Sequence, residues 1–179
     1  MKATLDLAAI KVAYAAASKD TRPILQHVKI GNGEIIACDG FILARRKIIT
    51  EPETEEVMLV NAATILKTHK MLGGEQLIIE SKEDGVAIIS NEEEDSPLIS
   101  TQLLQAEYPE YEQITPTSER KAYVVLNTFY LAKLLKIVDL EKSIVVKIKV
   151  REPNKPVEIL SHETTVYIMP YFSPEEGNV

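Results

Sequence analysis

The stretch Thr21–Arg46, TRPILQHVKIGNGEIIACDGFILARR, decides the fold class because it holds short apolar runs separated by tight turns. Pro23 lacks a backbone N–H and ends any helix that precedes it. Gly31-Asn32-Gly33 and Asp39-Gly40 consist of residues that tolerate positive φ, so both favour tight turns. A three-stranded β-meander is therefore predicted over the apolar runs Leu25–Ile30, Ile35–Cys38 and Phe41–Ala44, the last run ending in Arg45-Arg46-Lys47.

Composition favours a folded protein of a reducing compartment. The chain has 179 residues and 45% hydrophobic residues, enough for one packed domain or one and a half small ones. The single cysteine excludes an intramolecular disulfide framework, and no apolar run is long enough to cross a bilayer. Asp6 and Lys11 interrupt the apolar N-terminal stretch, which argues against a signal peptide. A cytoplasmic protein with no membrane partner is expected.

Three segments follow one plan, a helix and then a meander, so an α+β fold is predicted. Helices are expected over Leu5–Ser18, Ala62–Leu72 and Thr128–Val138, with Asp6, Asn61 and Asn127 as their N-caps. Gly73-Gly74 is a typical helix end. Strands are expected over 57–60, 76–80, 85–90, 97–104, 122–126, 143–150, 157–160 and 164–169.

The predicted domains follow from these three units. Residues 1–118 are expected to form one complete domain of two half-units, 1–52 and 57–118. Residues 119–172 are expected to form half a domain. Residues 173–179 are predicted to be a flexible acidic tail.

Lysines recur at fixed positions in the second and third units. They stand six and nine residues after the capping asparagine: Lys67 and Lys70 after Asn61, and Lys133 and Lys136 after Asn127. The first helix departs from this pattern, with Lys11 five residues after Asp6. The net charge of −7 argues against a nucleic-acid partner, but only the placement of the charges decides whether phosphate is contacted.

Three motifs together resemble the bacterial sliding clamp, the β subunit of DNA polymerase III. The first is Arg22, Leu25, Asp39, Gly40 and Leu43 within the opening stretch. The second is Tyr108-Pro109-Glu110-Tyr111 followed by Pro116, and the third is Val166–Pro170, VYIMP. The resemblance covers nearly the whole chain but only about half of a typical clamp: the complete middle domain and the second half of the last one.

The resemblance implies a DNA-clamp fold, three helix-plus-meander half-domain units with helices on one face of an antiparallel sheet. In that family the helices line a hole and face DNA, and an apolar pocket binds short peptides of polymerases and other partners. Half a domain left alone would expose unpaired strand edges, so self-association is expected. A ring of four chains and a symmetric dimer that completes the half-domain both satisfy this expectation.

A DNA-facing surface is predicted on the three helices. Lysine is a flexible point charge, which suits sequence-independent contact with the phosphates of double-stranded DNA. The alternative is an ordinary solvated helix face. The predicted residues are Lys11, Lys19, Arg22, Lys67, Lys70, Lys133 and Lys136.

A peptide-binding pocket is carried over from the family residue by residue. Small residues and a methionine suit an adaptable apolar groove. The alternative is that Leu25, Leu43 and Met169 are ordinary core residues, and Ile42 stands where the family often has a polar or basic residue. The predicted pocket comprises Leu25, Gly40, Leu43, Pro116, Met169 and Pro170, with Cys38, Phe41 and Tyr171 at its rim.

Two functions remain open at this stage. One is a sliding-clamp-like replication or repair processivity factor, a homo-oligomer that tracks DNA and tethers partners by their clamp-binding peptides. The other is a non-encircling interaction module, a competitor or regulator of replication proteins. No metal-binding, nucleophile or phosphate-loop motif occurs in the sequence, so an enzyme, a cofactor and a metal site are not expected.

Overall fold

The computed structural model describes most of the chain, which divides into two compact units, Met1–Thr115 (unit 1) and Pro116–Val179 (unit 2). The predicted domain boundary after residue 118 and the predicted tail 173–179 lie outside the described residues. The described residues are 1–52, 55–111, 124–139, 145–152, 155–161 and 164–171.

Unit 1 opens with a strand that the sequence pattern did not predict. β1 (Lys2–Asp6) precedes α1 (Leu7–Val12) and a 3-10 turn, Ala13–Ala15. The helix was predicted over Leu5–Ser18, but Leu5 lies in β1 and is fully buried. The α-helix ends at Val12, and residues 16–18 are not helical. The Asp6 cap is confirmed, since its Oδ1 accepts a hydrogen bond from the Ala9 amide at 2.7 Å.

The predicted meander is confirmed with two shifts: its first strand begins later than predicted, and its third begins at Leu43 rather than Phe41. β2 (His27–Gly31), β3 (Glu34–Cys38) and β4 (Leu43–Lys47) are antiparallel neighbours, and β5 (Ile49–Glu51) follows. Asn32 and Gly33 turn the chain between β2 and β3 at φ of 53° and 71°. Leu25, predicted in the first strand, lies instead in a 3-10 turn, Pro23–Gln26, because Pro23 suits the first position of a helical turn.

The second repeat follows the same plan with a longer helix. β6 (Val57–Asn61) leads into α2 (Ala62–Leu72), and β7 (Gln76–Lys82), β8 (Val86–Asn91) and β9 (Ile99–Gln102) form its meander. The predicted bounds of α2 are confirmed. Asn61 Oδ1 accepts a hydrogen bond from the Thr64 amide at 3.1 Å, and Gly73 leaves the helix at a φ of 70°.

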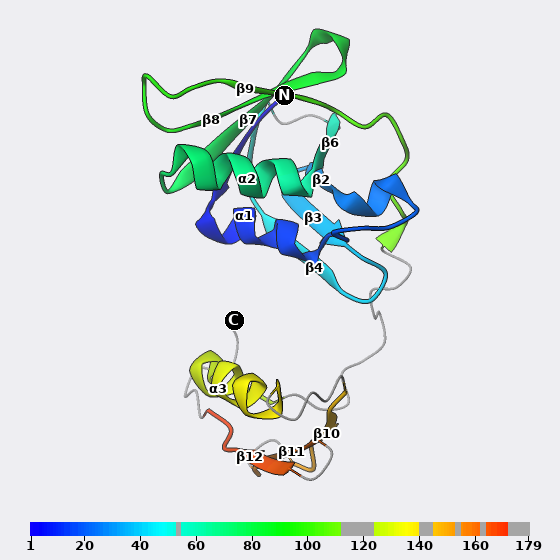
Figure 1. Cartoon of the computed structure of the whole chain (residues 1–179), viewed down its shortest axis with the longest axis vertical. Helices are drawn as coiled ribbons and strands as arrows, with labels where there is room; N and C mark the ends of the chain where they lie inside the picture. Colours follow the sequence, from blue (N-terminus) through cyan, green and yellow to red (C-terminus); the bar gives the residue numbers. More distant parts are fainter. Residues whose placement is uncertain (53–54, 112–123, 140–144, 153–154, 162–163, 172–179) are drawn as a thin grey trace. The chain divides into compact units, whose positions relative to one another are not determined.

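The two repeats of unit 1 exchange the strands that precede their helices. β1 pairs with β7 of the second repeat, and β6 pairs with β2 of the first. The resulting sheets have the orders β5-β1-β7-β8-β9 and β4-β3-β2-β6. One core, built from both sheets and both helices, fills the space between them, and Figure 1 shows α1 and α2 side by side, in agreement with their contact.

Unit 2 contains one such repeat in its described part. α3 (Thr128–Asp139) is followed by β10 (Lys147–Lys149), β11 (Val157–Ser161) and β12 (Thr164–Ile168), in the order β10-β11-β12 (Figure 1). Residues 124–126, predicted as the end of a strand, have no regular secondary structure. The small core of unit 2 consists of the buried residues Leu134, Val157, Ile159 and Ile168. The α+β class with antiparallel meanders is thus confirmed.

Candidate functional site

The Asp39-Gly40 turn presents apolar side chains to solvent in unit 1. Asp39 Oδ1 accepts hydrogen bonds from the amides of Ile42 and Phe41, at 2.9 and 2.8 Å, which lower the pKa of this carboxyl. Gly40 takes a φ of 92°, a conformation that side chains disfavour. The turn therefore holds Phe41, whose surface is 96% exposed, and the exposed Ile42 away from the core. An exposed aromatic side chain on a fixed turn is a candidate anchor for a partner.

Tyr108 contacts β3, the strand that precedes this turn, and the sequence did not predict this contact. Its hydroxyl lies 3.6 Å from Cys38 Sγ and donates to the Ile36 carbonyl at 3.5 Å. Burial, with the Cys38 contact, raises the pKa of Tyr108 well above its usual value. The Tyr108-Pro109 motif marked this segment in the sequence, but the motif does not indicate which residues Tyr108 contacts. Tyr108 thus attaches the last described segment of unit 1 to β3.

The other predicted pocket residues of unit 1 are less accessible. Leu25 and Cys38 are buried, and Leu43 is half-buried. Leu25 and Cys38 therefore pack in the interior of unit 1, whereas Phe41 and the exposed Gly40 lie at its surface. In unit 1 taken by itself, the exposed turn offers more contact surface than the buried Leu25.

The predicted pocket residues of unit 2 follow β12. Met169 is 66% exposed, Tyr171 is exposed and Pro170 is half-buried. Pro116 lies outside the described residues. Because the remaining pocket residues are divided between the two units, a joint pocket stays a prediction.

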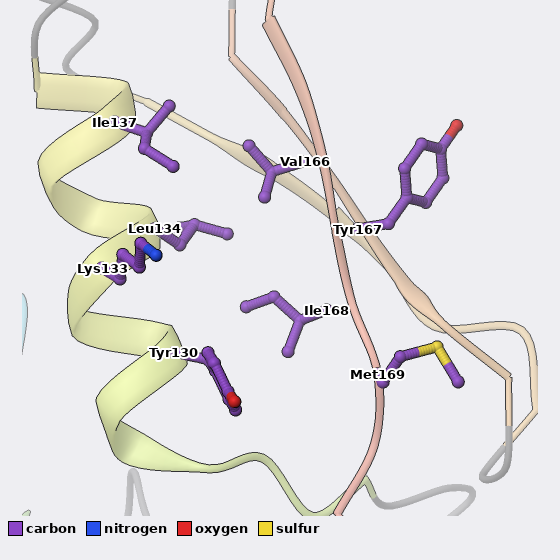
Figure 2. A pocket seen from close by; sticks show the side chains of 8 residues that line it. All are labelled: Tyr130, Lys133, Leu134, Ile137, Val166, Tyr167, Ile168 and Met169. Atoms are coloured by element: carbon purple, nitrogen blue, oxygen red, sulfur yellow. The ribbon is translucent and has the colours of Figure 1, made fainter.

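A groove that the sequence did not predict lies between α3 and β12 in unit 2. Its volume is about 360 Å³, and most of its accessible lining is apolar. Figure 2 shows Val166 and Ile168 pointing toward α3, while Tyr167 points to the other side of the strand. Only Met169 and Lys133 among its residues belong to the predicted sites. The groove is lined by Tyr130, Lys133, Leu134, Ile137, Val166, Tyr167, Ile168 and Met169.

The lysines predicted to face DNA are exposed on the three helices. Lys11 lies on α1, and Lys67 and Lys70 lie on α2, which is in contact with α1. Lys133 and Lys136 are exposed on α3 in unit 2. The exposed ends of these side chains are able to contact phosphate, and equally to remain solvated.

Arg22 differs from the lysines because an acidic neighbour binds it. Its Nε lies 3.0 Å and its Nη2 lies 3.2 Å from the two carboxylate oxygens of Asp20. This bidentate hydrogen bond raises the pKa of Arg22 and lowers that of Asp20. Lys19 is exposed nearby in sequence. Asp20 therefore offsets much of the charge that Arg22 would bring to a phosphate.

The described residues contain neither a membrane-spanning helix nor a metal-binding cluster. No helix in them has the length and apolar character needed to span a membrane. The same residues contain no cluster of three or more His, Cys, Asp or Glu side chains able to hold a metal ion.

Comparison with solved structures identifies the fold. A sliding clamp from Bacillus subtilis matches with a TM-score of 0.69 and 17% identity, over 95% of this chain and 49% of that one. A putative DNA polymerase III β subunit from Eubacterium rectale matches with a TM-score of 0.76 and 14% identity, over 95% and 50%. The Helicobacter pylori β clamp bound to a DNA ligase peptide matches with a TM-score of 0.69 and 16% identity, over 94% and 50%. No family model matches the sequence.

These matches show a sliding-clamp fold. The resemblance read from the three sequence motifs is thereby confirmed at the level of the fold. The chain spans about half the length of the clamps that it matches.

Proposed function

Because the chain has the fold of bacterial sliding clamps, we propose that it is a clamp-like processivity factor of DNA replication or repair. In this role it tracks double-stranded DNA and tethers partner proteins by short peptides. The observation that carries the proposal is the match of 95% of the chain to sliding-clamp structures. The role is one of binding rather than catalysis, and its place is the cytoplasm.

The exposed helix lysines support the DNA part of the proposal. The sequence spacing between the helix cap and the two lysines is the same in both helices: Lys67 and Lys70 on α2 match Lys133 and Lys136 on α3. A repeated cationic position on helices is suited to phosphates, which carry no sequence information. The overall charge of −7 does not oppose this, because the contact depends on the local field.

Exposed apolar side chains support the peptide part. Phe41 on its hydrogen-bonded turn and Met169 after β12 both stand at positions where the family resemblance places pocket residues. An aromatic ring and a flexible thioether are side chains that anchor an aliphatic or aromatic peptide residue. The Helicobacter pylori clamp was solved with a DNA ligase peptide. We propose a clamp-binding peptide of a polymerase or repair protein as the ligand here.

A second function is favoured by the ion pair between Arg22 and Asp20. An acidic chain in which Asp20 already binds Arg22 fits an interaction module that kept the peptide site without binding DNA. Such a module would compete for, or regulate, replication proteins.

One pair of titrations tests the proposal. The full chain is added to a fluorescently labelled clamp-binding peptide and, separately, to a labelled DNA duplex at low salt. A processivity factor binds both, and the interaction module binds the peptide alone. A chain that binds neither the peptide nor the duplex contradicts both functions.

A further inference from the structure

One hydrogen bond identifies the counterpart of β6 in unit 2. In unit 1, the Leu104 amide donates to the Leu59 carbonyl at 3.0 Å, and Leu59 stands two residues before the capping Asn61. In unit 2, the Tyr171 amide donates to the Val125 carbonyl at 2.8 Å, and Val125 stands two residues before Asn127. Residues 124–127 therefore occupy the position of β6 beside their own repeat.

β10 is the counterpart of β7 by the same comparison. Ile79 of β7 pairs with the buried Ile89, and Ile148 of β10 pairs with the buried Ile159. The two isoleucines nevertheless differ in exposure: Ile79 is fully buried, whereas Ile148 is 58% exposed. In unit 1 the second edge of β7 is covered by β1, the strand given by the other repeat. In the described part of unit 2, β10 stands at a sheet edge.

β10 exposes charged side chains on one face and an apolar side chain on the other. On the polar side, Glu158 of the neighbouring β11 accepts hydrogen bonds from Lys149 Nζ at 3.4 Å and from Arg151 Nη2 at 2.7 Å, while Lys147 is exposed. Val146 and Val150 stand two residues before and two residues after Ile148, and both are exposed as well. On α3, Leu135 and Ile137 are also exposed. An edge strand with an exposed apolar face is a template for pairing with another strand.

Unit 1 shows which strand covers this edge. There each repeat gives its pre-helix strand to the other and receives one in return. Unit 2 carries both the pre-helix segment to give and the edge to receive one. A second copy of the chain supplies both with the same reciprocity, which is the self-complementary geometry of a twofold dimer.

We propose that two copies of unit 2 complete each other by strand exchange. Residues 124–127 of each copy pair antiparallel with β10 of the other. Unit 1 gives the register, because Leu5 pairs with Leu77 and Ala3 with Ile79, one and three residues before the cap. In the dimer, Leu126 therefore stands opposite Val146, and Val124 opposite Ile148. The pairing buries Ile148 as β1 buries Ile79. It depends on neither DNA nor peptide binding.

Cysteine cross-linking of the full chain tests this register. Directly opposed residues of an antiparallel pair stand about 4.5–5.5 Å apart between Cα atoms, within disulfide range. A double variant, Val124→Cys with Ile148→Cys, places two such pairs in each dimer. A disulfide bond between the two cysteines of one copy is not expected. Val125 is hydrogen-bonded to Tyr171, which follows β12, whereas β10 lies at the opposite edge of the sheet. The matched control is Val124→Cys with Val150→Cys, a diagonal separation of about 7–8 Å.

The expected result is a wild-type dimer, or an assembly of dimers, by sedimentation at micromolar concentration. Under mild oxidation the Val124/Ile148 variant should give mostly covalent dimer, several-fold more than the Val124/Val150 control. The wild-type chain, which retains the buried Cys38, gives the background. A wild-type monomer overturns the proposal. So does a dimer in which the two cysteine variants cross-link equally.

Discussion

Tyr108 lies with its hydroxyl 3.6 Å from the sulfur of Cys38, across 70 positions of the sequence. The same hydroxyl reaches the Ile36 carbonyl at 3.5 Å. β3 carries both of these partners and leads directly into the Asp39-Gly40 turn. The tyrosine therefore fixes the last described segment of unit 1 against the base of the turn that presents Phe41.

Tyr108→Phe removes this hydroxyl and keeps the ring. We expect the free energy of unfolding to fall by about 0.5–1 kcal/mol, because both contacts are long and the Ile36 carbonyl loses a partner. Urea denaturation at neutral pH measures the change. An unchanged midpoint would show that the hydroxyl contributes nothing to stability.

The same tyrosine predicts a loss of stability in alkali. The folded chain raises the pKa of Tyr108 above the ordinary value of 10.0, mainly by burial. Above that pH the unfolded chain releases the proton that the folded chain retains, so the free energy of unfolding falls as pH rises. The difference in this fall between wild type and Tyr108→Phe, measured by urea titration from neutral pH to about pH 11, isolates the residue. Parallel pH profiles would contradict the assignment.

Asp6 makes two separable contributions at the start of α1. Its carboxylate caps the helix through Ala9 and binds Arg46 Nη2 at 2.6 Å. Asp6→Ala should cost about 1 kcal/mol of stability, while Asp6→Asn keeps the cap and loses only the exposed ion pair. The Arg46 hydrogen bond, more than the cap, holds the pKa of Asp6 below 3.8, so the carboxylate's contribution is present above that pH and lost below it. Urea titrations at neutral pH and near pH 3 check both effects. Equal destabilisation by the two variants would refute the capping role.

Phe41 and Met169 are expected to be the main contributors to peptide binding. Replacing either by alanine removes an exposed apolar side chain, so the fold should be unaffected and the peptide affinity should fall about tenfold or more. Leu98→Ala is the matched control, because Leu98 is an exposed leucine in unit 1 outside the predicted pocket. Fluorescence polarisation with a labelled clamp-binding peptide measures the three variants. A loss of affinity as large in the Leu98 variant would remove the assignment.

Much of the fold followed from local signals in the sequence. Asn61 and Gly73 bracket α2 because a side-chain cap and a positive φ are local requirements. β1 was missed, since Lys2–Asp6 offers only two buried apolar residues and runs directly into an alanine-rich helix. The exchange of β1 and β6 between repeats also escaped prediction. The residue pattern of a strand specifies which face is buried but not which strand lies beside it.

The candidate site was predictable to a similar degree. The Asp39-Gly40 pair correctly indicated a turn, and the turn explains why Phe41 is exposed. The Tyr108–Cys38 contact and the groove between α3 and β12 join segments far apart in sequence, and no local pattern encodes such contacts. The exposure of Ile148 was likewise hidden, because its alternation with lysines is that of an ordinary half-buried strand.

DNA binding by the helix lysines tests the central claim most directly. The variant carries Lys→Glu at Lys67, Lys70, Lys133 and Lys136. The control carries Lys→Glu at four exposed lysines elsewhere and changes the net charge equally: Lys2, Lys47, Lys82 and Lys155. Fluorescence anisotropy with a labelled duplex measures the affinity of all three proteins.

For the wild type we expect weak binding that falls about a hundredfold between about 50 and 200 mM salt, as four phosphate contacts require. The helix variant should lose this binding, while the control should keep its salt dependence with only a modest general weakening. Equal binding by the wild type and the helix variant, or no binding by the wild type at low salt, would contradict a clamp that tracks DNA.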